Sequence, residues 1–472
     1  MVVTEGLSPY QVIPCGENGL TDFKCSGTIK SLTDEGTVEL RIPTLKGFQR
    51  WLSVGVTQGS TWSAQLTNLP AGGPYTLEFR VRDEQEATRD NGTISPVFVG
   101  DLWILAGQSN MYGYAHLPKE QVQDPKVMAY MMDNTWQLAR DPMHRQDGTY
   151  YQAYAPPPTT TKEALESLMS RKGSGLGLPF AKELVKATGR PIGLIPCAVG
   201  GTTMDQWSPG LKDEGGDSLY GAMLERFRRT GSNVRGILWY QGESDAKTAE
   251  AFKKKFLRFV REVRRDFDAP LLPFYYVQIG RVVASQDDLS WNRIQWSQLE
   301  CEKQLGPGAM IPAIDLELDD NVHLGLRGLR TVGHRLAKIA LSDLYEGPKM
   351  ETGPRPEKAT WVVTPQGVQI RVTFKHVNGR LYCAGRVNGF SVCNAEGAPL
   401  VVLFDQEIAQ DCDDTVILWV SYLPKYGYDV PKDAGVFYGQ GLNPYCNLTD
   451  DENMGVPCFG PLAITWPTTT TD

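Results

Sequence analysis

Two different rhythms of hydrophobic and polar residues divide the chain into three regions. Near both ends, apolar and polar positions alternate in short runs such as 37–42, 75–81, 368–372 and 415–420, and turn residues separate the runs. Period-two alternation with glycine and proline between the runs is typical of antiparallel strands that bury one face. The pattern therefore predicts a β-sandwich-like domain at each end.

Between these regions the pattern changes to apolar runs that alternate with helical stripes. Mostly apolar runs predict buried strands at 102–106, 192–198, 234–240, 271–279 and 310–316. Apolar residues with helical spacing mark three helices: Phe180, Leu184 and Ala187, ending at Gly189; Phe252, Phe256, Phe259, Val263 and Phe267; and Leu329, Leu336, Ile339 and Ala340. Strands that alternate with helices predict an α/β domain with a doubly wound parallel sheet, whose ligands bind beyond the carboxyl ends of the strands.

The change of pattern predicts three domains. They are an N-terminal β-rich domain at 1–98, an α/β domain at 99–346, and a C-terminal β-rich domain at 347–472 that ends in a Thr-rich tail. A chain of 472 residues fits two to four domains of ~100 to 200 residues each.

The stretch 133–177 interrupts the α/β pattern without a clear pairing pattern of its own. It contains three tyrosines, Tyr150, Tyr151 and Tyr154. A loop of this length in a compact domain is usually functional or disordered. The tyrosines favour a functional loop, such as a rim over the site.

Composition and charge exclude several classes of protein. The chain is 41% hydrophobic, which is too apolar for a disordered protein, and its 47 Lys and Arg against 55 Asp and Glu make nucleic acid an unfavourable partner. No run of about 18 apolar residues could span a membrane, and the first twenty residues lack the basic start and apolar stretch of an export signal. The nine cysteines show no CxxC spacing, so neither zinc nor a redox pair is indicated, and both buried thiols and disulfides remain open.

Candidate chemistry begins directly after the first buried strand. The sequence Gly-Gln-Ser-Asn-Met at 107–111 puts Ser109 just past the carboxyl end of that strand. A serine nucleophile needs a base within hydrogen-bond reach and donors directed at the oxyanion that forms. Taken alone, Ser109 could equally be the N-cap of the next helix.

An acid and a histidine follow the last buried strand, in a chain with only five histidines. Asp320 and His323 are three residues apart, which lets the carboxylate hold Nδ1–H of the imidazole and leave Nε2 facing the serine. By itself this spacing also fits a solvated turn, and Asp319 is the fallback partner for the histidine. In combination with Ser109, the pair favours a Ser-His-Asp triad.

Two further loops at the same edge offer hydrogen-bond donors. Gly200 and Gly201 follow the second strand and let the backbone approach a ligand, and Gln241 follows the third strand and offers its side-chain amide. With the N–H of Ser109 they predict an oxyanion hole, in which each donor lowers the barrier by roughly 2.7 to 4 kcal/mol. Singly, each is also compatible with a turn glycine or a loop glutamine.

Four blocks resemble, in order and spacing, those of the sialate O-acetylesterase-like carbohydrate esterases, a branch of the SGNH hydrolases. The blocks lie at 107–111, 200–202, 239–244 and 320–323. The resemblance covers about residues 96–345, and the flanking regions are similar to accessory β domains of many members. It implies a flavodoxin-like SGNH catalytic domain with Ser109 as nucleophile, His323 as general base and then acid, and Asp320 as the residue that orients His323.

The same resemblance implies roles for residues around the triad. Ser109, Gly200 or Gly201, and Gln241 would form the oxyanion hole. Behind these residues or against the substrate would lie Glu243, Asn110, Trp207 and His116. For Glu243 we expect a role in holding a loop rather than direct catalysis. Independently of the resemblance, Trp207 is open between stacking on a sugar ring and simple packing, and His116, seven residues after Ser109, could reach the substrate.

The implied function is a carbohydrate O-acetylesterase that removes acetyl groups from an acetylated oligo- or polysaccharide through an acetyl-serine intermediate, without a metal or other cofactor. One alternative keeps the serine chemistry but acts on longer acyl chains, as a lipase does. Another is a non-catalytic carbohydrate-binding protein with a degenerate site, against which the intact set of residues argues. The resemblance favours a secreted or periplasmic protein and leaves the glycan open among xylan, xyloglucan and sialic acid, as it does the oligomeric state.

Overall fold

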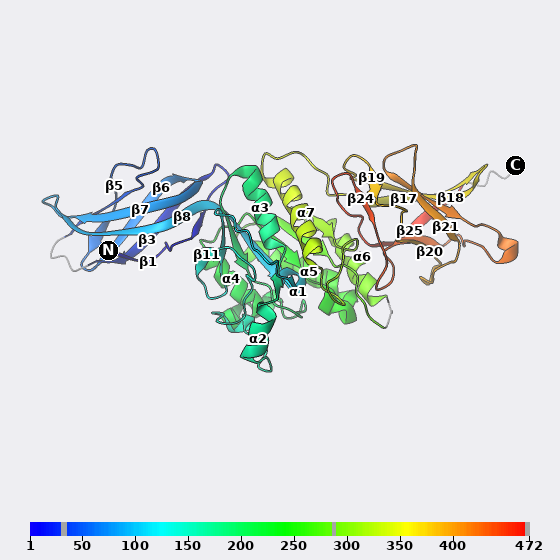
Figure 1. Cartoon of the computed structure of the whole chain (residues 1–472), viewed down its shortest axis with the longest axis horizontal. Helices are drawn as coiled ribbons and strands as arrows, with labels where there is room; N and C mark the ends of the chain where they lie inside the picture. Colours follow the sequence, from blue (N-terminus) through cyan, green and yellow to red (C-terminus); the bar gives the residue numbers. More distant parts are fainter. Residues whose placement is uncertain (30–34, 286–288, 468–472) are drawn as a thin grey trace. The chain divides into compact units, whose positions relative to one another are not determined.

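The computed structural model describes residues 1–29, 35–285 and 289–467 (Figure 1). The chain forms two compact units: the first contains Met1–Ala106, Leu117–Val199 and Gly210–Leu238, and the second contains Gly107–His116, Gly200–Pro209 and Trp239–Asp472. All the predicted catalytic and oxyanion residues belong to the second unit. The predicted Thr-rich tail, at 468–471, lies outside the described residues.

The N-terminal strands belong to the first unit. They are β1 (Val2–Glu5), β2 (Val12–Pro14), β3 (Leu20–Thr28), β4 (Thr37–Arg41), β5 (Leu52–Gln58), β6 (Thr61–Pro70), β7 (Gly72–Arg82) and β8 (Thr88–Gly107). Seven of them pair in the order β1-β3-β6-β5-β4-β7-β8, each antiparallel to its neighbour. The alternation at 37–42 and 75–81 therefore gave β4 and β7, as predicted, and the inward residues Val38, Leu40, Leu77, Phe79 and Val81 are buried.

Strand β8 continues without a break from the N-terminal strands into the parallel strands (Figure 1). Its last residues pair in parallel with β13 (Ile192–Pro196). The predicted limit between residues 98 and 99 thus falls inside a single strand. The strand delivers the chain directly to the loop that holds Ser109.

The five predicted buried strands are all present. With β8 and β13 they include β14 (Gly236–Tyr240), β15 (Phe274–Gln278) and β16 (Met310–Pro312), in the order β13-β8-β14-β15-β16. Strands β8 and β14 each contribute residues to both units. Numbered among these five strands alone, this is the order 2-1-3-4-5 of flavodoxin-like doubly wound sheets, in which ligands bind beyond the first and third strands. Here those are β8 and β14.

Two strands of this sheet were not predicted from the sequence. Strand β10 (Val127–Tyr130) pairs in parallel with β13, and β11 (Trp136–Leu138) pairs antiparallel with β10. Both extend the sheet beyond β13. The short strands β9 (Ala115–His116) and β12 (Lys172–Ser174) were not predicted either.

Three helices coincide with the predicted stripes. They are α3 (Gly177–Thr188), α5 (Ala249–Asp266) and α7 (Leu326–Leu344), and Gly189 ends α3 with a left-handed φ of 69°. The remaining helices are α1 (Ser109–Tyr112), α2 (Lys162–Met169), α4 (Leu219–Arg229) and α6 (Ser290–Glu302), with 3₁₀ turns η1 (Gln152–Tyr154), η2 (Pro209–Asp217), η3 (Glu243–Thr248) and η4 (Pro424–Tyr426). Within the described ranges, no helix is both long enough and apolar enough to cross a bilayer.

The stretch 133–177 is more ordered than the sequence suggested, since it contains β11, η1, α2 and β12. Tyr151 and Tyr154 are 3% and 0% exposed, and their rings meet edge to face at 6.1 Å. Only Tyr150 of the three is exposed. The prediction of an irregular aromatic rim is therefore wrong for two of its three tyrosines, which form part of a core.

The C-terminal strands belong to the second unit. They are β17 (Arg355–Thr364), β18 (Gly367–Lys375), β19 (Leu381–Cys383), β20 (Phe390–Cys393), β21 (Leu403–Ile408), β22 (Thr415–Val420), β23 (Gly435–Tyr438), β24 (Leu448–Asp450) and β25 (Phe459–Thr465). Seven of them form a sheet in the order β20-β23-β25-β17-β18-β22-β21. The runs at 368–372 and 415–420 gave β18 and β22, which pair antiparallel as predicted.

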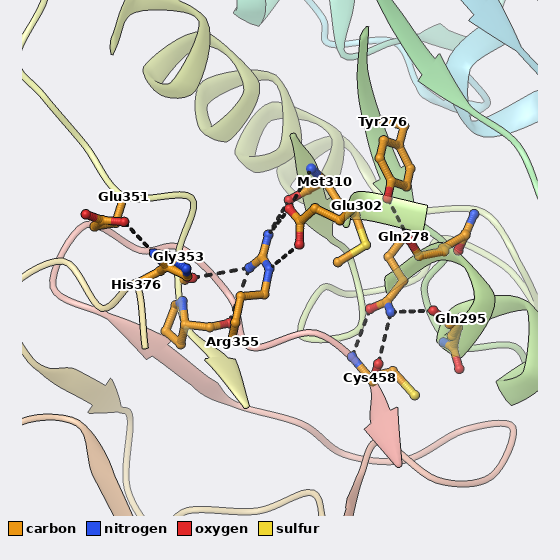
Figure 2. A network of polar contacts seen from close by, with 12 residues as sticks. Tyr276, Gln278, Gln295, Glu302, Met310, Glu351, Gly353, Arg355, His376 and Cys458 are labelled. Carbon is orange, nitrogen blue, oxygen red and sulfur yellow. Dashed lines mark hydrogen bonds and ion pairs between the residues drawn. The ribbon is translucent and has the colours of Figure 1, made fainter. Parts of the chain in front are cut away.

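Buried polar contacts attach these strands to the parallel strands of the same unit (Figure 2). Arg355 at the start of β17 donates to both carboxylate oxygens of Glu302, at 2.8 and 2.9 Å. Although burial acts to raise the pKa of Glu302, the Arg355 guanidinium keeps it below its ordinary value. Gln278 at the end of β15 exchanges two hydrogen bonds with the backbone of Cys458, at 2.8 and 3.0 Å.

The cysteines form no disulfide. All nine lie among the described residues with free thiols, and seven of them are buried. Of the two readings that the sequence left open, the structure has the free thiols.

Candidate active site

The loop that carries Ser109 begins where β8 ends. Gly107 has a φ of 133°, and a Cβ atom there would lie 2.1 Å from the carbonyl oxygen of Tyr240, so only glycine fits this close approach to β14. The N–H of Gln108 then donates to the same oxygen at 2.8 Å. Ser109 is the first residue of the short helix α1, and Gln108 occupies the N-cap position. Ser109 is therefore not a helix cap.

Three side chains form a continuous line of hydrogen bonds. Ser109 Oγ lies 2.9 Å from His323 Nε2, and His323 Nδ1 lies 2.8 Å from Asp320 Oδ2. Ser109 and His323 are 214 positions apart in the sequence. The fold thus brings together the three residues that the blocks suggested, with the imidazole between a hydroxyl and a carboxylate.

The other oxygen of Asp320 is occupied by the backbone of its own turn. Oδ1 accepts the N–H groups of Val322 at 3.0 Å and of His323 at 2.8 Å. Burial acts to raise the pKa of Asp320, but these N–H groups and the His323 ring outweigh it and hold the pKa at about 2. The carboxylate is therefore charged at any pH at which the protein would work.

Asp319 has a different partner from the one considered for it. Its Oδ2 accepts the N–H of His116 at 3.2 Å and lies 3.8 Å from His116 Nε2. Because Asp320 holds His323, Asp319 does not orient the imidazole. The His116 side chain is 61% exposed beside it, at the edge of the site.

The two glycines of the second loop lie open beside the serine. A Cβ atom on Gly200 would be 3.7 Å from Ser109 Cβ, and one on Gly201 would meet no atom within 4 Å. In the part of the chain that the structure describes, neither the N–H of Ser109 nor that of Gly201 donates to a protein acceptor. Both donors are available to a ligand oxygen.

Gln241 is more strongly engaged than the sequence suggested. Its side chain is fully buried, and Nε2 donates to the carbonyl of Thr202 at 3.1 Å and to Asp245 Oδ2 at 2.5 Å. Its Oε1 is buried and lacks a hydrogen-bond partner among the described residues. The amide thus ties the third loop to the second, and a contact with an oxyanion requires that one of these bonds be exchanged.

Asn110 links Ser109 to the loop of His323. Its Oδ1 accepts the N–H of Leu324 at 3.0 Å, and its Nδ2 donates to Val322 O at 3.4 Å, so it holds the backbone on both sides of His323. Nδ2 also donates to Glu243 Oε1 at 2.7 Å. Sequence reasoning placed Asn110 near the site but gave no sign of this bridge, because it depends on contacts with residues more than 200 positions away.

Glu243 lies behind Asn110 and does not touch the triad in any described contact. Its Oε2 is buried without a partner among the described residues, and burial raises the pKa of Glu243 to about 7, against the hydrogen bond from Asn110. The expected role in holding a loop agrees with this geometry.

Trp207 is packed in the interior, so of the two roles left open for it the structure has simple packing and not stacking on a sugar ring. The residue is 0% exposed, its ring packs edge to face against Trp239 at 5.2 Å, and its Nε1 donates to Thr202 Oγ1 at 3.0 Å. The indole is too large and apolar to remain at the surface when a pocket beside α5 can bury it. Through its hydrogen bond to Thr202 it supports the loop that carries Gly200 and Gly201.

Tyr114 is a site residue that the sequence analysis missed. Its ring lies 4.2 Å from the His323 ring, centroid to centroid, with an angle of 31° between the planes. It covers one face of the His323 imidazole. An aromatic residue five positions after Ser109 was the only signal available.

Comparison with known proteins agrees with this geometry. Residues 99–342 match the model of a family described as carbohydrate esterase, sialic acid-specific acetylesterase. A probable carbohydrate esterase of Arabidopsis thaliana is 28% identical over 274 residues, which are 53% of this chain and 93% of that protein. Human sialate O-acetylesterase is 25% identical over 359 residues, and the match covers 63% of each chain.

A solved structure shares the fold over nearly the full length. It is that of a carbohydrate acetylesterase from Xanthomonas citri, which covers 97% of this chain and 99% of its own with a TM-score of 0.65 at 21% identity. The mixed α/β architecture with several sheets is thus common to both. At this level of identity the likeness concerns the fold alone.

Proposed function

Because the chain belongs to the carbohydrate esterase family of sialic acid-specific acetylesterases, we propose that it removes acetyl groups from an acetylated oligo- or polysaccharide. The observation that supports this most strongly is the line Ser109–His323–Asp320, with 2.9 and 2.8 Å between its members. A hydroxyl, an imidazole and a carboxylate in this order are what acyl transfer requires.

In the proposed first step, Ser109 Oγ attacks the carbonyl carbon of the acetyl ester while His323 Nε2 takes the serine proton. The oxyanion that forms accepts the N–H groups of Ser109 and Gly201, with Gly200 as the neighbouring donor. His323 then gives the proton to the sugar oxygen as the C–O bond breaks. The sugar leaves as an alcohol, and the acetyl group stays on Ser109.

In the second step, water loses a proton to His323 Nε2 and attacks the acetyl-serine. The proton returns to Ser109 Oγ as acetate leaves. Asp320, ionised because its pKa is about 2, accepts Nδ1–H of the ring throughout and stabilises the imidazolium in both steps.

The direct test is acetate release by Ser109→Ala from p-nitrophenyl acetate and from acetylated xylan, xyloglucan and sialosides. Ser53→Ala, an exposed serine in β5, is the matched control. We expect the first variant to lose at least 10³-fold in turnover, as removal of a triad member does elsewhere, and the second to match the wild type. Undiminished activity of Ser109→Ala would end the proposed mechanism.

The same assay separates this proposal from a longer-chain esterase. A series of p-nitrophenyl esters from acetyl to octanoyl should show the highest kcat/KM at acetyl. Rates that rise beyond butyryl would instead favour a lipase-like enzyme.

A further inference from the structure

A loop of the C-terminal β region reaches the loop that carries the catalytic histidine. We call residues 439–446, between β23 and β24, the rim loop. Its Leu442 carbonyl accepts the N–H of Val282 at 2.7 Å. The next residue, Val283, donates its N–H to the carbonyl of Asn321, also at 2.7 Å. Asn321 is two residues before His323. Two consecutive backbone hydrogen bonds therefore connect the rim loop to the catalytic loop, all within the second unit.

Hydrogen bonds with neighbouring residues hold the rim loop in a fixed conformation. Asn292 of α6 is fully buried, and it donates to Gly439 O at 3.0 Å and accepts the N–H of Gly441 at 2.8 Å. Between them, the Gln440 side chain accepts from Ser391 Oγ at 2.9 Å and donates to Gly397 O at 2.8 Å. A loop that is already ordered loses little entropy when a ligand binds.

The outer side of the rim loop carries groups suited to a sugar. Tyr445 is 69% exposed, and Asn443 is exposed and accepts a hydrogen bond from Arg281 Nη1 at its Oδ1, at 2.5 Å. Arg281 also acts on Cys446, the neighbour of Tyr445, where it opposes the burial that raises the pKa of the thiol. The Arg281 guanidinium thus contacts the rim loop at Asn443.

These groups match the two kinds of surface that a sugar ring presents. A tyrosine ring offers an apolar face with a polar end, against which the C–H face of a pyranose packs. Amide and guanidinium groups offer fixed donors and acceptors for its hydroxyls. The triad itself contacts only the acetyl ester, so a polysaccharide chain needs other surface near the serine to be held.

We propose that Arg281, Asn443 and Tyr445 form a subsite for a neutral sugar unit of the polysaccharide backbone, next to the unit that carries the acetyl group. The proposal rests on the proposed function and specifies which part of the carbohydrate this esterase holds outside its triad. In this proposal, residues of the C-terminal β region contact the substrate directly.

The test compares substrates that do and do not reach the subsite. For Tyr445→Ala, we expect the ratio of kcat/KM on acetylated xylo-oligosaccharides to kcat/KM on p-nitrophenyl acetate to fall about tenfold, mainly through KM. A tenfold loss corresponds to about 1.4 kcal/mol of binding. Tyr445→Phe keeps the ring and should retain most of the ratio. Tyr426→Ala, which removes a 78% exposed tyrosine from η4 of the same β region, should leave the ratio unchanged.

The outcomes distinguish the subsite from the activity. If the wild type deacetylates the oligosaccharides and Tyr445→Ala keeps the ratio within twofold, the subsite is refuted and the esterase stands. If no glycan releases acetate although p-nitrophenyl acetate is hydrolysed through Ser109, the proposed function fails. Calorimetry with unacetylated xylo-oligosaccharides and xyloglucan oligosaccharides on Ser109→Ala then decides the subsite: binding that Tyr445→Ala abolishes supports it, and absence of binding overturns it.

Discussion

Replacing Glu243 by glutamine should stabilise the protein more strongly as the pH rises. Glu243 is buried behind Asn110, and its pKa is raised from 4.5 to about 7 by burial, with a further contribution from the nearby carboxylate of Asp245. A carboxyl group with a raised pKa in the folded state favours folding only while it is protonated. Its stabilising contribution is thus complete below pH 4.5 and is lost as the pH rises through about 7.

The size of this loss follows from the two pKa values. The difference between 4.5 and about 7, at 1.36 kcal/mol for each pKa unit, gives a penalty that approaches about 3 kcal/mol above pH 7. Glutamine cannot ionise, and its Oε1 still accepts the hydrogen bond that Asn110 Nδ2 now makes at 2.7 Å. The free energy of unfolding of Glu243→Gln should therefore exceed that of the wild type by less than about 1 kcal/mol at pH 5 and by about 3 kcal/mol at pH 8.

Urea unfolding of both proteins at pH 5, 6, 7 and 8 measures this difference. Glu357→Gln, which neutralises an exposed carboxylate, is the control and should show no trend. A difference between Glu243→Gln and wild type that stays constant from pH 5 to pH 8 would refute the reasoning, because it would mean that Glu243 is not a buried titrating group.

Two other substitutions test the remaining polar contacts. Asp320→Asn should lower kcat on acetyl esters by on the order of 10⁴-fold, because an amide favours the wrong tautomer of His323. Steady-state kinetics at constant pH measures this loss. A loss below tenfold would contradict the assigned role of Asp320. Arg355→Met should lower the free energy of unfolding by about 3 to 5 kcal/mol, since Glu302 would remain buried without its partner. The double variant Arg355→Met/Glu302→Leu should recover most of that loss, as measured by urea unfolding. Equal losses in the single and double variants would count against the buried pair.

The predictable part of the fold was the part in which local pattern and burial agree. Long apolar runs are typical of strands that are buried on both faces of a parallel sheet, so five of the parallel strands were predicted, and β10 was not. Their ends were less certain: the run at 310–316 gave a strand of three residues, because the chain turns after Pro312 and Leu316 donates its N–H to Ala313 O. Strand β10 was missed because four apolar residues carry too little periodicity to predict a strand.

The candidate site divides in the same way. The sequence places Ser109 after one strand, and Asp320 and His323 after another with a spacing of three that suits a carboxylate–imidazole pair. The structure brings the three side chains together. The burial of Trp207 and the bonds of Gln241 depend on which side chains surround them in three dimensions. A spacing along the chain holds no information on that, so the sequence left Trp207 open between stacking and packing and offered the Gln241 amide as an oxyanion donor.

The distance of 214 positions between Ser109 and His323 also has a kinetic consequence. Contacts so far apart in the sequence close a long loop and form only after much local structure exists. During synthesis, a chain that ends before residue 323 carries Ser109 and the proposed oxyanion donors but lacks the proposed base. In the proposed mechanism, hydrolysis begins only after β16 and the turn that follows it have folded, which makes esterase activity a reporter for the folding of this edge of the sheet.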